Sequence, residues 1–103
     1  MSIIARRTLR EFVESLAGHA DQRAVKAALD AWYAGAKKAA WKRPADIKAT
    51  YRSASLLRDR RVVFNICANS YRLVVKVNYV TGVVYVRFIG NHAAYDAIDA
   101  EEV

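Results

Sequence analysis

The stretch from residue 61 to residue 96 constrains the fold most, because it reads as three consecutive β-strands that run into a short polar segment. Between residues 71 and 79 every odd-numbered residue is apolar or aromatic, whereas the even-numbered ones include Arg72, Lys76 and Asn78. Successive side chains of a strand point to opposite faces of a sheet. We therefore expect one apolar face that packs into a core and one face that carries cations.

A two-residue hairpin turn is expected at Thr81-Gly82, between the second and third of these strands. Such a turn places Lys76 opposite Arg87 and Arg72 opposite Asn91. Two cations directly opposite each other destabilise a sheet by up to ~1 kcal/mol. A face that gathers them suggests an anionic ligand, and phosphate is the anion we expect. In this register the core residues of the third strand are Val84, Val86 and Phe88, with Tyr85 and Arg87 on the other face.

Length and composition predict a single domain, residues 1–103, with one core. Hydrophobic residues make up 54% of the chain, which argues against disorder, and no apolar run approaches the roughly 18–20 residues of a membrane span. The N-terminal segment is too charged for a signal peptide. The single cysteine, Cys67, cannot form an internal disulfide. Together these features predict a protein of the reducing cytoplasm with no membrane association.

The positive charge is concentrated in one part of the chain. Residues 37–61 hold nine of the 17 basic residues and only two of the ten acidic ones, so they carry the whole formal net charge of +7. Such a block is typical of a polyanion-binding protein, and nucleic acid is the usual polyanion. The same block can also be a solvated charged surface without a ligand. Within it, Trp41 and Tyr51 alternate with cations, a pattern that suits bases stacked on rings in single-stranded RNA.

The remaining segments predict helices. Thr8 and Glu11 fit a capping box at the start of a first amphipathic helix, and Asp21 fits the N-cap of a second helix that reaches about Lys38. Pro44 suits the first turn of a short third helix, and residues 2–5 suit an edge strand. We therefore predict an α+β fold in which two N-terminal helices pack on a small antiparallel β-sheet, with a short helix after the last strand.

None of the common sequence signatures of enzymes is present: there is no glycine-rich phosphate loop and no spacing of metal ligands, so neither a metal nor another cofactor is expected. RNA can nevertheless be cleaved by attack of its own 2′-hydroxyl on the adjacent phosphate. That reaction needs a base, an acid and cations that stabilise the growing charge. The residues that could supply these roles are Arg72, Arg87, Lys48, Lys76, His92 and Tyr95.

The sequence resembles the HigB toxins of bacterial type II toxin–antitoxin modules, which belong to the RelE-like mRNA interferase superfamily. The resemblance covers nearly the whole chain and is carried by four segments: WKRPADIKATY (41–51), RVVFNIC (61–67), YRLVVK (71–76) and FIGNHAAYD (88–96). It implies a RelE-like microbial RNase fold and a ribosome-dependent endoribonuclease that cleaves mRNA during translation, without a metal. It also implies an antitoxin of the HigA type, which carries a helix-turn-helix DNA-binding domain and forms a hetero-oligomer with the toxin.

The resemblance also implies roles for individual residues. Arg72 matches a catalytic arginine that contacts phosphate in RelE-like toxins, and Tyr95 matches a tyrosine in the segment after the last strand. RelE has an arginine in that segment where this chain has His92, which acts either as an acid–base residue or by positioning the phosphate. Asp96 is expected to be a local cap or an ion-pair partner. The RNA-binding residues expected around this catalytic set are Lys48, Arg52, Lys76, Arg87, Lys42 and Arg43.

Two other functions fit the same residues. The first is a basic module that binds RNA or the ribosome without catalysis, and the second is a protein-interaction domain whose basic patch meets an acidic partner. Incubation with translating ribosomes separates these two functions from the endoribonuclease. The endoribonuclease cuts mRNA, the non-catalytic module only binds RNA, and the protein-interaction domain does neither.

Overall fold

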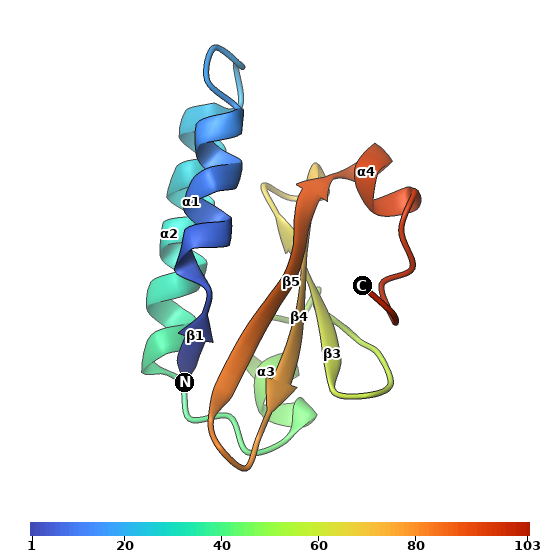
Figure 1. Ribbon diagram of the computed structural model, residues 1–103. Coiled ribbons are helices and arrows are strands. Elements are labelled where there is room, and N and C mark those ends of the chain that lie inside the picture. Colours follow the sequence, from blue (N-terminus) through green and yellow to red (C-terminus); the bar gives the residue numbers. More distant parts are fainter.

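The computed structural model describes residues 1–103 as a mixed five-stranded sheet with helices against it (Figure 1). The sheet order is β1-β5-β4-β3-β2, in which β1 runs parallel to β5 and all other pairs are antiparallel. The predicted α+β class, with two N-terminal helices on the sheet, is confirmed. The sheet is mixed rather than antiparallel as expected, because β1 pairs with β5 in the parallel direction. The strands are β1 (Ser2–Ile4), β2 (Ser55–Leu56), β3 (Arg61–Ile66), β4 (Tyr71–Asn78) and β5 (Val83–Asn91), and the helices are α1 (Arg6–Ser15), α2 (Gln22–Lys38), α3 (Pro44–Thr50) and α4 (His92–Asp96).

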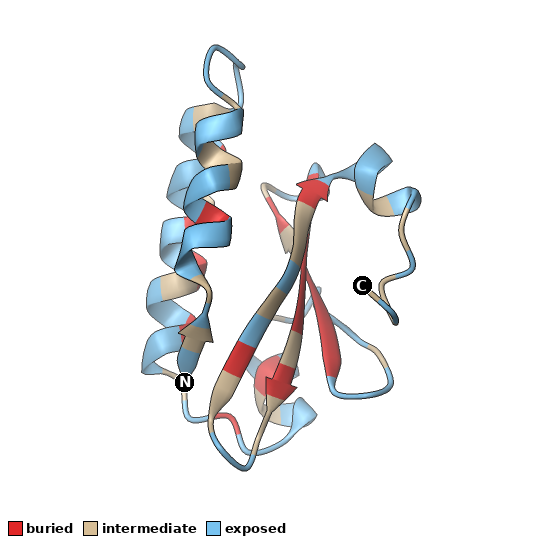
Figure 2. Cartoon of the chain, in the orientation of Figure 1, coloured by how far each residue is buried: buried red, intermediate tan, exposed pale blue.

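The two N-terminal helices lie on one face of the sheet, and the chain after β5 lies on the other (Figure 1). We call the face away from α1 and α2 the outer face. Buried residues concentrate in β3 and β4, whereas α4 has no buried residue (Figure 2). None of the helices combines the length and the apolarity that a membrane span requires.

The helix boundaries follow the sequence with one exception. The first helix begins at Arg6 rather than at Thr8, because the Thr8 N–H already donates to the Ala5 carbonyl (3.2 Å) and closes a turn there. Asp21 is the N-cap residue of α2 as predicted, but its carboxylate accepts a hydrogen bond from the Tyr71 hydroxyl (3.0 Å) instead of capping the helix. The helix α3 begins at Pro44 as predicted.

An aromatic cluster around Phe64 forms the centre of the core. Trp32 and Tyr51 meet the Phe64 ring edge-on at centroid distances of 5.4 and 5.1 Å, and Trp41 stacks against it at 6.3 Å. Trp41 is only 5% exposed, and burial raises the pKa of Tyr51. The expectation that Trp41 and Tyr51 offer their rings to RNA bases is therefore wrong, because both rings are used to fill the core.

The hairpin between β4 and β5 differs from the prediction. Its loop has four residues, 79–82, because the Asn78 side-chain oxygen accepts from the N–H groups of Val80 and Thr81, both at 3.1 Å, and holds the turn open. Gly82 takes the φ of 72° that closes it. Lys76 consequently pairs with Tyr85 rather than with Arg87.

A β-bulge in β5 changes which residues face the core. The pairing with β4 slips by one residue between Val86 and Phe88, so Arg87 is the extra residue. Beyond this bulge the alternation reverses: Phe88 lies on the outer face, and Ile89 packs against the core in its place. Arg72 accordingly pairs with Gly90 instead of Asn91.

The strand β2 was not predicted, because two exposed residues give no alternation to read. Its turn to β3 contains Asp59 and Arg60, both with φ of 59°, which is the left-handed region that non-glycine residues rarely adopt. A second such pair, Cys67 and Ala68 with φ of 53° and 58°, starts the turn from β3 to β4.

Candidate active site

Cross-strand pairing arranges the outer-face side chains of β3, β4 and β5 in three rows. The row nearest α4 is polar, the middle row is apolar, and the third row carries two cations. The rows are Asn65, Arg72 and Gly90; Val63, Val74 and Phe88; and Arg61, Lys76 and Tyr85. The apolar row explains why Val63 and Val74 are buried although neither belongs to the core under the helices.

The first row brings Arg72 against Tyr95 of α4. The guanidinium carbon lies 5.8 Å from the centre of the Tyr95 ring, and the ring is 6.5 Å from that of Phe88. One nitrogen of Arg72, Nη1, donates to the carbonyl of Asn69 (2.8 Å) in the β3–β4 turn. Only Nη1 of this guanidinium has protein partners, so Nε and Nη2 can donate to an anion such as a phosphate.

His92 starts α4 on the same edge of the molecule. Its backbone N–H donates to the Ser70 carbonyl (3.2 Å), and its exposed imidazole places Nδ1 3.1 Å from Oδ2 of Asp96, one helical turn later. Of the two roles expected for Asp96, a local cap or an ion-pair partner, the contact fits the second, and it is an ion pair when His92 is protonated. When the carboxylate accepts from Nδ1–H, the lone pair of neutral imidazole is on Nε2, which faces away from Asp96 and can accept a proton.

The three residues expected to be catalytic are thus neighbours in the fold. Asn91, which caps α4 by accepting from the Ala94 N–H at 2.8 Å, fixes the start of the helix that carries His92 and Tyr95. Arg72 pairs with Gly90, two residues before His92, which corresponds to about 7 Å along the strand. No hydrogen bond joins the side chains of Arg72 and His92, so each keeps polar atoms available for a substrate group.

Two of the expected RNA-binding cations, Lys76 of the third row and the bulge residue Arg87, already have partners within the protein. The Lys76 ammonium donates to Asp59 (3.0 Å) and lowers the pKa of that carboxyl below its usual value, so the pair persists at neutral pH and is lost only as the pH falls through the lowered pKa. Arg87 donates from Nε to the Val103 carbonyl oxygen (3.2 Å). Both residues lie on the outer face as predicted.

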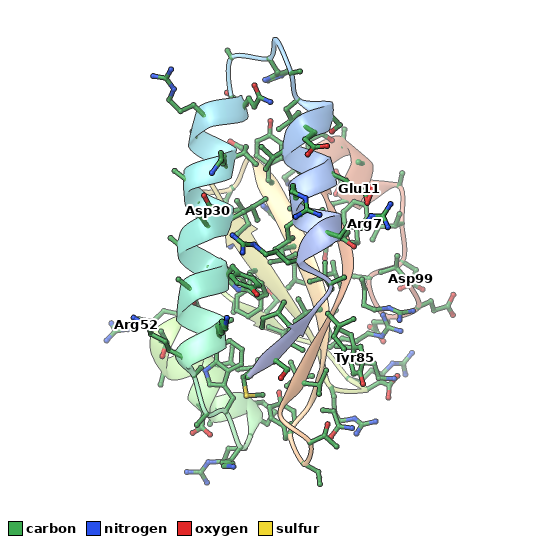
Figure 3. The ribbon with its side chains drawn as sticks, turned by 60° about the vertical axis from the view of Figure 1, so that its left-hand side comes forward. Arg7, Glu11, Asp30, Arg52, Tyr85 and Asp99 are labelled. Atoms are coloured by element: carbon green, nitrogen blue, oxygen red, sulfur yellow. The ribbon has the colours of Figure 1, made fainter.

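The other expected RNA-binding residues do not join this surface. Lys42 and Arg43 directly precede α3, which lies at the end of the sheet opposite α4 (Figure 1). Lys48 donates to the carbonyl of Ala54 beside β2, and Arg52 extends from the α3 side of the molecule (Figure 3). The charge block of residues 37–61 is therefore divided among several surfaces.

No enclosed hollow accompanies the candidate site. A groove of about 440 Å³ lies between α1 and α2, and a smaller one of about 210 Å³ lies between α2 and β3. Neither is lined by Arg72, His92 or Tyr95. The site is an open surface, which suits a polymeric substrate better than a small molecule. No three His, Cys, Asp or Glu side chains gather anywhere as a group that could hold a metal ion.

One comparison with known proteins identifies the family. A protein-family model described as HigB_toxin, RelE-like toxic component of a toxin-antitoxin system, matches residues 25–98, well over half of the chain. The chain belongs to this family. The resemblance to HigB toxins is confirmed, and membership implies an antitoxin as partner. A search of curated proteins found no match.

The matched stretch of this RelE-like toxin runs from α2 through α4, so it includes all three candidate catalytic residues and excludes α1. It also includes three outer-face residues that sequence reasoning did not assign to the site: Phe88, Arg58 and Arg61. Phe88 was missed because strict alternation along β5 assigns it to the core, whereas the bulge at Arg87 turns it to the outer face. The sequence reasoning did not name the partner of Asp96, and the i, i+4 spacing on a helix could have identified it as His92.

Gly90 gives a first test of how the toxin supports Tyr95. A Cβ at this position would lie 2.6 Å from Cζ of Phe88 and 3.2 Å from Cβ of Ala94, so the Phe88 ring must move. We expect Gly90→Ala to lower the free energy of unfolding by about 1–3 kcal/mol and to shift the Tyr95 ring resonances. Urea denaturation and NMR measure the two effects. In a Phe88→Leu background, which removes Cζ, the cost should be smaller; an equal cost would place the strain elsewhere.

Proposed function

We propose that this toxin is an mRNA interferase, an endoribonuclease that cleaves mRNA on the translating ribosome and so arrests growth. The observation that carries the proposal is that Arg72, which has free guanidinium donors, and the His92–Asp96 pair lie at the same edge of an open face. Charge stabilisation and proton transfer are the two functions that metal-free RNA cleavage requires. Family membership supports the toxin role.

In the proposed reaction the RNA is its own nucleophile. The 2′-oxygen loses its proton to a base and attacks the adjacent phosphorus, and the bond from phosphorus to the 5′-oxygen breaks. That oxygen takes a proton from an acid, so the products are a 2′,3′-cyclic phosphate and a 5′-hydroxyl. No water and no metal enter this step.

Each residue of the proposed site has a role in that step. Arg72 donates to the phosphate oxygens on which charge grows, because Nε and Nη2 are free. His92 uses Nε2 either to transfer a proton or to position the phosphate, and Asp96 orients the ring. Tyr95, half-buried between Arg72 and Phe88, orients the guanidinium and offers a ring for a neighbouring base.

Lys76 and Arg87 extend the proposed RNA path along the outer face, and Lys48 and Arg52 are proposed to contact RNA or ribosome at the β2 edge. Lys42 and Arg43, at the far end of the molecule, would then contact a different part of the ribosome from the cleaved strand. The proposed partner in the resting cell, where ribosomes and toxin share the cytoplasm, is an antitoxin of the HigA type that forms a hetero-oligomer with the toxin.

A cleavage assay with the purified toxin and translating ribosomes tests the proposal directly. We expect purified toxin to cut a translated mRNA and to leave 2′,3′-cyclic phosphate or 3′-phosphate ends. Toxin treated with EDTA and then freed of it by gel filtration should cut at the same rate when it is added to intact ribosomes. End-labelling of the fragments identifies the products. Fragments with 5′-phosphate and 3′-hydroxyl ends would instead indicate water as the nucleophile and a metal at the site, and RNA binding without cleavage would indicate a non-catalytic module.

A further inference from the structure

The last seven residues form an acidic strap over the cationic end of the outer face. We define the strap as residues 97–103, which follow α4 and carry Asp99, Glu101 and Glu102. In the figures the strap lies on the side of the sheet away from α2 (Figures 1 and 3). Internal hydrogen bonds shape it, among them the Asp99 carboxylate accepting from the Glu101 N–H at 2.9 Å.

Three arginines of the outer face bind this strap. Arg58 forms an ion pair with Glu101, and Arg61 donates from Nη1 to the Val103 carbonyl oxygen. Arg87, the bulge residue of β5, donates from Nε to the same oxygen at 3.2 Å. Three separate segments of the chain, the β2–β3 turn, β3 and β5, therefore direct guanidinium groups at one place.

The burial and hydrogen bonding of Arg61 indicate which kind of ligand this arginine cluster is suited to bind. It is 6% exposed, its Nε has no hydrogen-bond partner, and it pairs across the strands with another cation, Lys76. A buried guanidinium with an unsatisfied donor beside a second cation is costly unless an anion lies close by. The strap supplies acceptor oxygens and negative charge, but its contacts leave that donor of Arg61 unused.

We propose that Arg58, Arg61 and Arg87 form a second phosphate-binding subsite for single-stranded RNA, and that the strap occupies it until RNA displaces it. The subsite lies four residues along the strands from the row of Arg72, or about 13 Å, with the apolar row between them. A strand bound at Arg72 and continuing across Phe88 reaches it directly. This inference rests on the proposed function, because it takes the outer face as the path of the RNA.

The strap is held weakly enough to be displaced. The Arg58 side chain is 86% exposed and that of Glu101 38%, and ion pairs at such positions contribute little to stability. No side chain of the strap is buried, so few packing contacts oppose its displacement. A phosphate can accept from several guanidinium nitrogens at once, including the Nε of Arg61 that the strap leaves without a partner.

The test measures binding of a single-stranded RNA decamer whose 2′-hydroxyls are methylated, so that it cannot be cleaved. We expect the strap variant Glu101→Gln/Glu102→Gln to bind it about three- to fivefold more tightly than the unchanged protein, because a competing group is weakened. The matched control, Glu11→Gln/Glu14→Gln on α1, removes the same charge from the other side of the molecule and should change the affinity much less at 0.15 M salt.

A second background separates displacement from a general charge effect. With Arg58→Gln the decamer should bind more weakly, and the strap substitutions should then give little further gain, because Glu101 no longer has its partner in the subsite. Equal gains in the strap and control variants, gains that persist with Arg58→Gln, or no gain at all would overturn the inference. All variants alter exposed side chains, and melting temperatures verify that they fold.

The two proposals fail separately. If the strap variants bind RNA as expected but translated mRNA is not cleaved, the subsite stands and the nuclease assignment falls. If cleavage occurs but the strap and control variants bind the decamer equally, the nuclease assignment stands and the strap has no part in RNA binding.

Discussion

Replacing Arg72 by alanine is expected to abolish growth arrest when the toxin is expressed without its antitoxin. The guanidinium is the group placed to stabilise charge on the phosphate, and removal of one such donor costs about 2–4 kcal/mol of transition-state stabilisation, or roughly 10²–10³-fold in rate. Arg72 is only half-buried, and its protein hydrogen bonds go to two backbone carbonyls. We therefore expect the free energy of unfolding to fall by no more than about 1 kcal/mol.

The measurement pairs the growth of induced cells with the melting temperature of the purified variant. Arg23→Ala is the matched control, because Arg23 is an exposed arginine of α2, and that variant should remain toxic. A toxic Arg72→Ala variant, or one that loses toxicity only because it unfolds, would show that Arg72 is structural.

Replacing His92 by glutamine is expected to lower the cleavage rate by about 10²–10⁴-fold if the imidazole transfers a proton. Glutamine keeps hydrogen-bonding capacity but cannot exchange a proton near neutral pH, so a smaller loss would assign His92 to positioning the phosphate. The side chain is exposed, and the hydrogen bond to Ser70 comes from the backbone, so the melting temperature should change little. Single-turnover cleavage of ribosome-bound mRNA measures the rate.

The chain provides its own control for this substitution. His19, the only other histidine, is exposed in the connection between α1 and α2, and His19→Gln should cleave at the unchanged rate. Asp96→Asn tests the role of the carboxylate. If Asp96 only orients the ring, that variant should lose less activity than His92→Gln and should show a shifted pH–rate profile. Full activity of His92→Gln would exclude this histidine from the reaction.

Local patterns were sufficient to predict most of the fold. The helical stripe of α2, the proline at the start of α3 and the alternation in β4 each depend on neighbouring residues alone, and each gave the right element. The bulge at Arg87 could not be predicted in this way. It adds one residue to a strand whose alternation alone assigns Phe88 to the core. The pairing of Phe88 with Val74 and its packing against Tyr95, which place it on the outer face, are visible only in the structure.

The candidate site shows the same division between local and long-range information. Arg72, His92 and Tyr95 lie within one hairpin and the helix that follows it, so a local reading could place them together. The charge block of residues 37–61 could not be placed in space from its sequence, because its first part lies at the end of α2 and in the connection to α3, at the far end of the sheet from α4. Trp41 and Tyr51 are core residues since their rings meet Phe64, a contact that sequence spacing does not reveal.

The openness of the outer face determines what kind of inhibitor can work on this toxin. A drug-sized compound gains affinity from being enclosed, and neither of the two grooves of the molecule is lined by Arg72, His92 or Tyr95. A compound that fills either groove would leave the proposed cleavage surface uncovered. Effective blockers of that surface should instead be extended molecules, such as an anionic peptide or a nucleic-acid mimic, which spread their contacts across several strands.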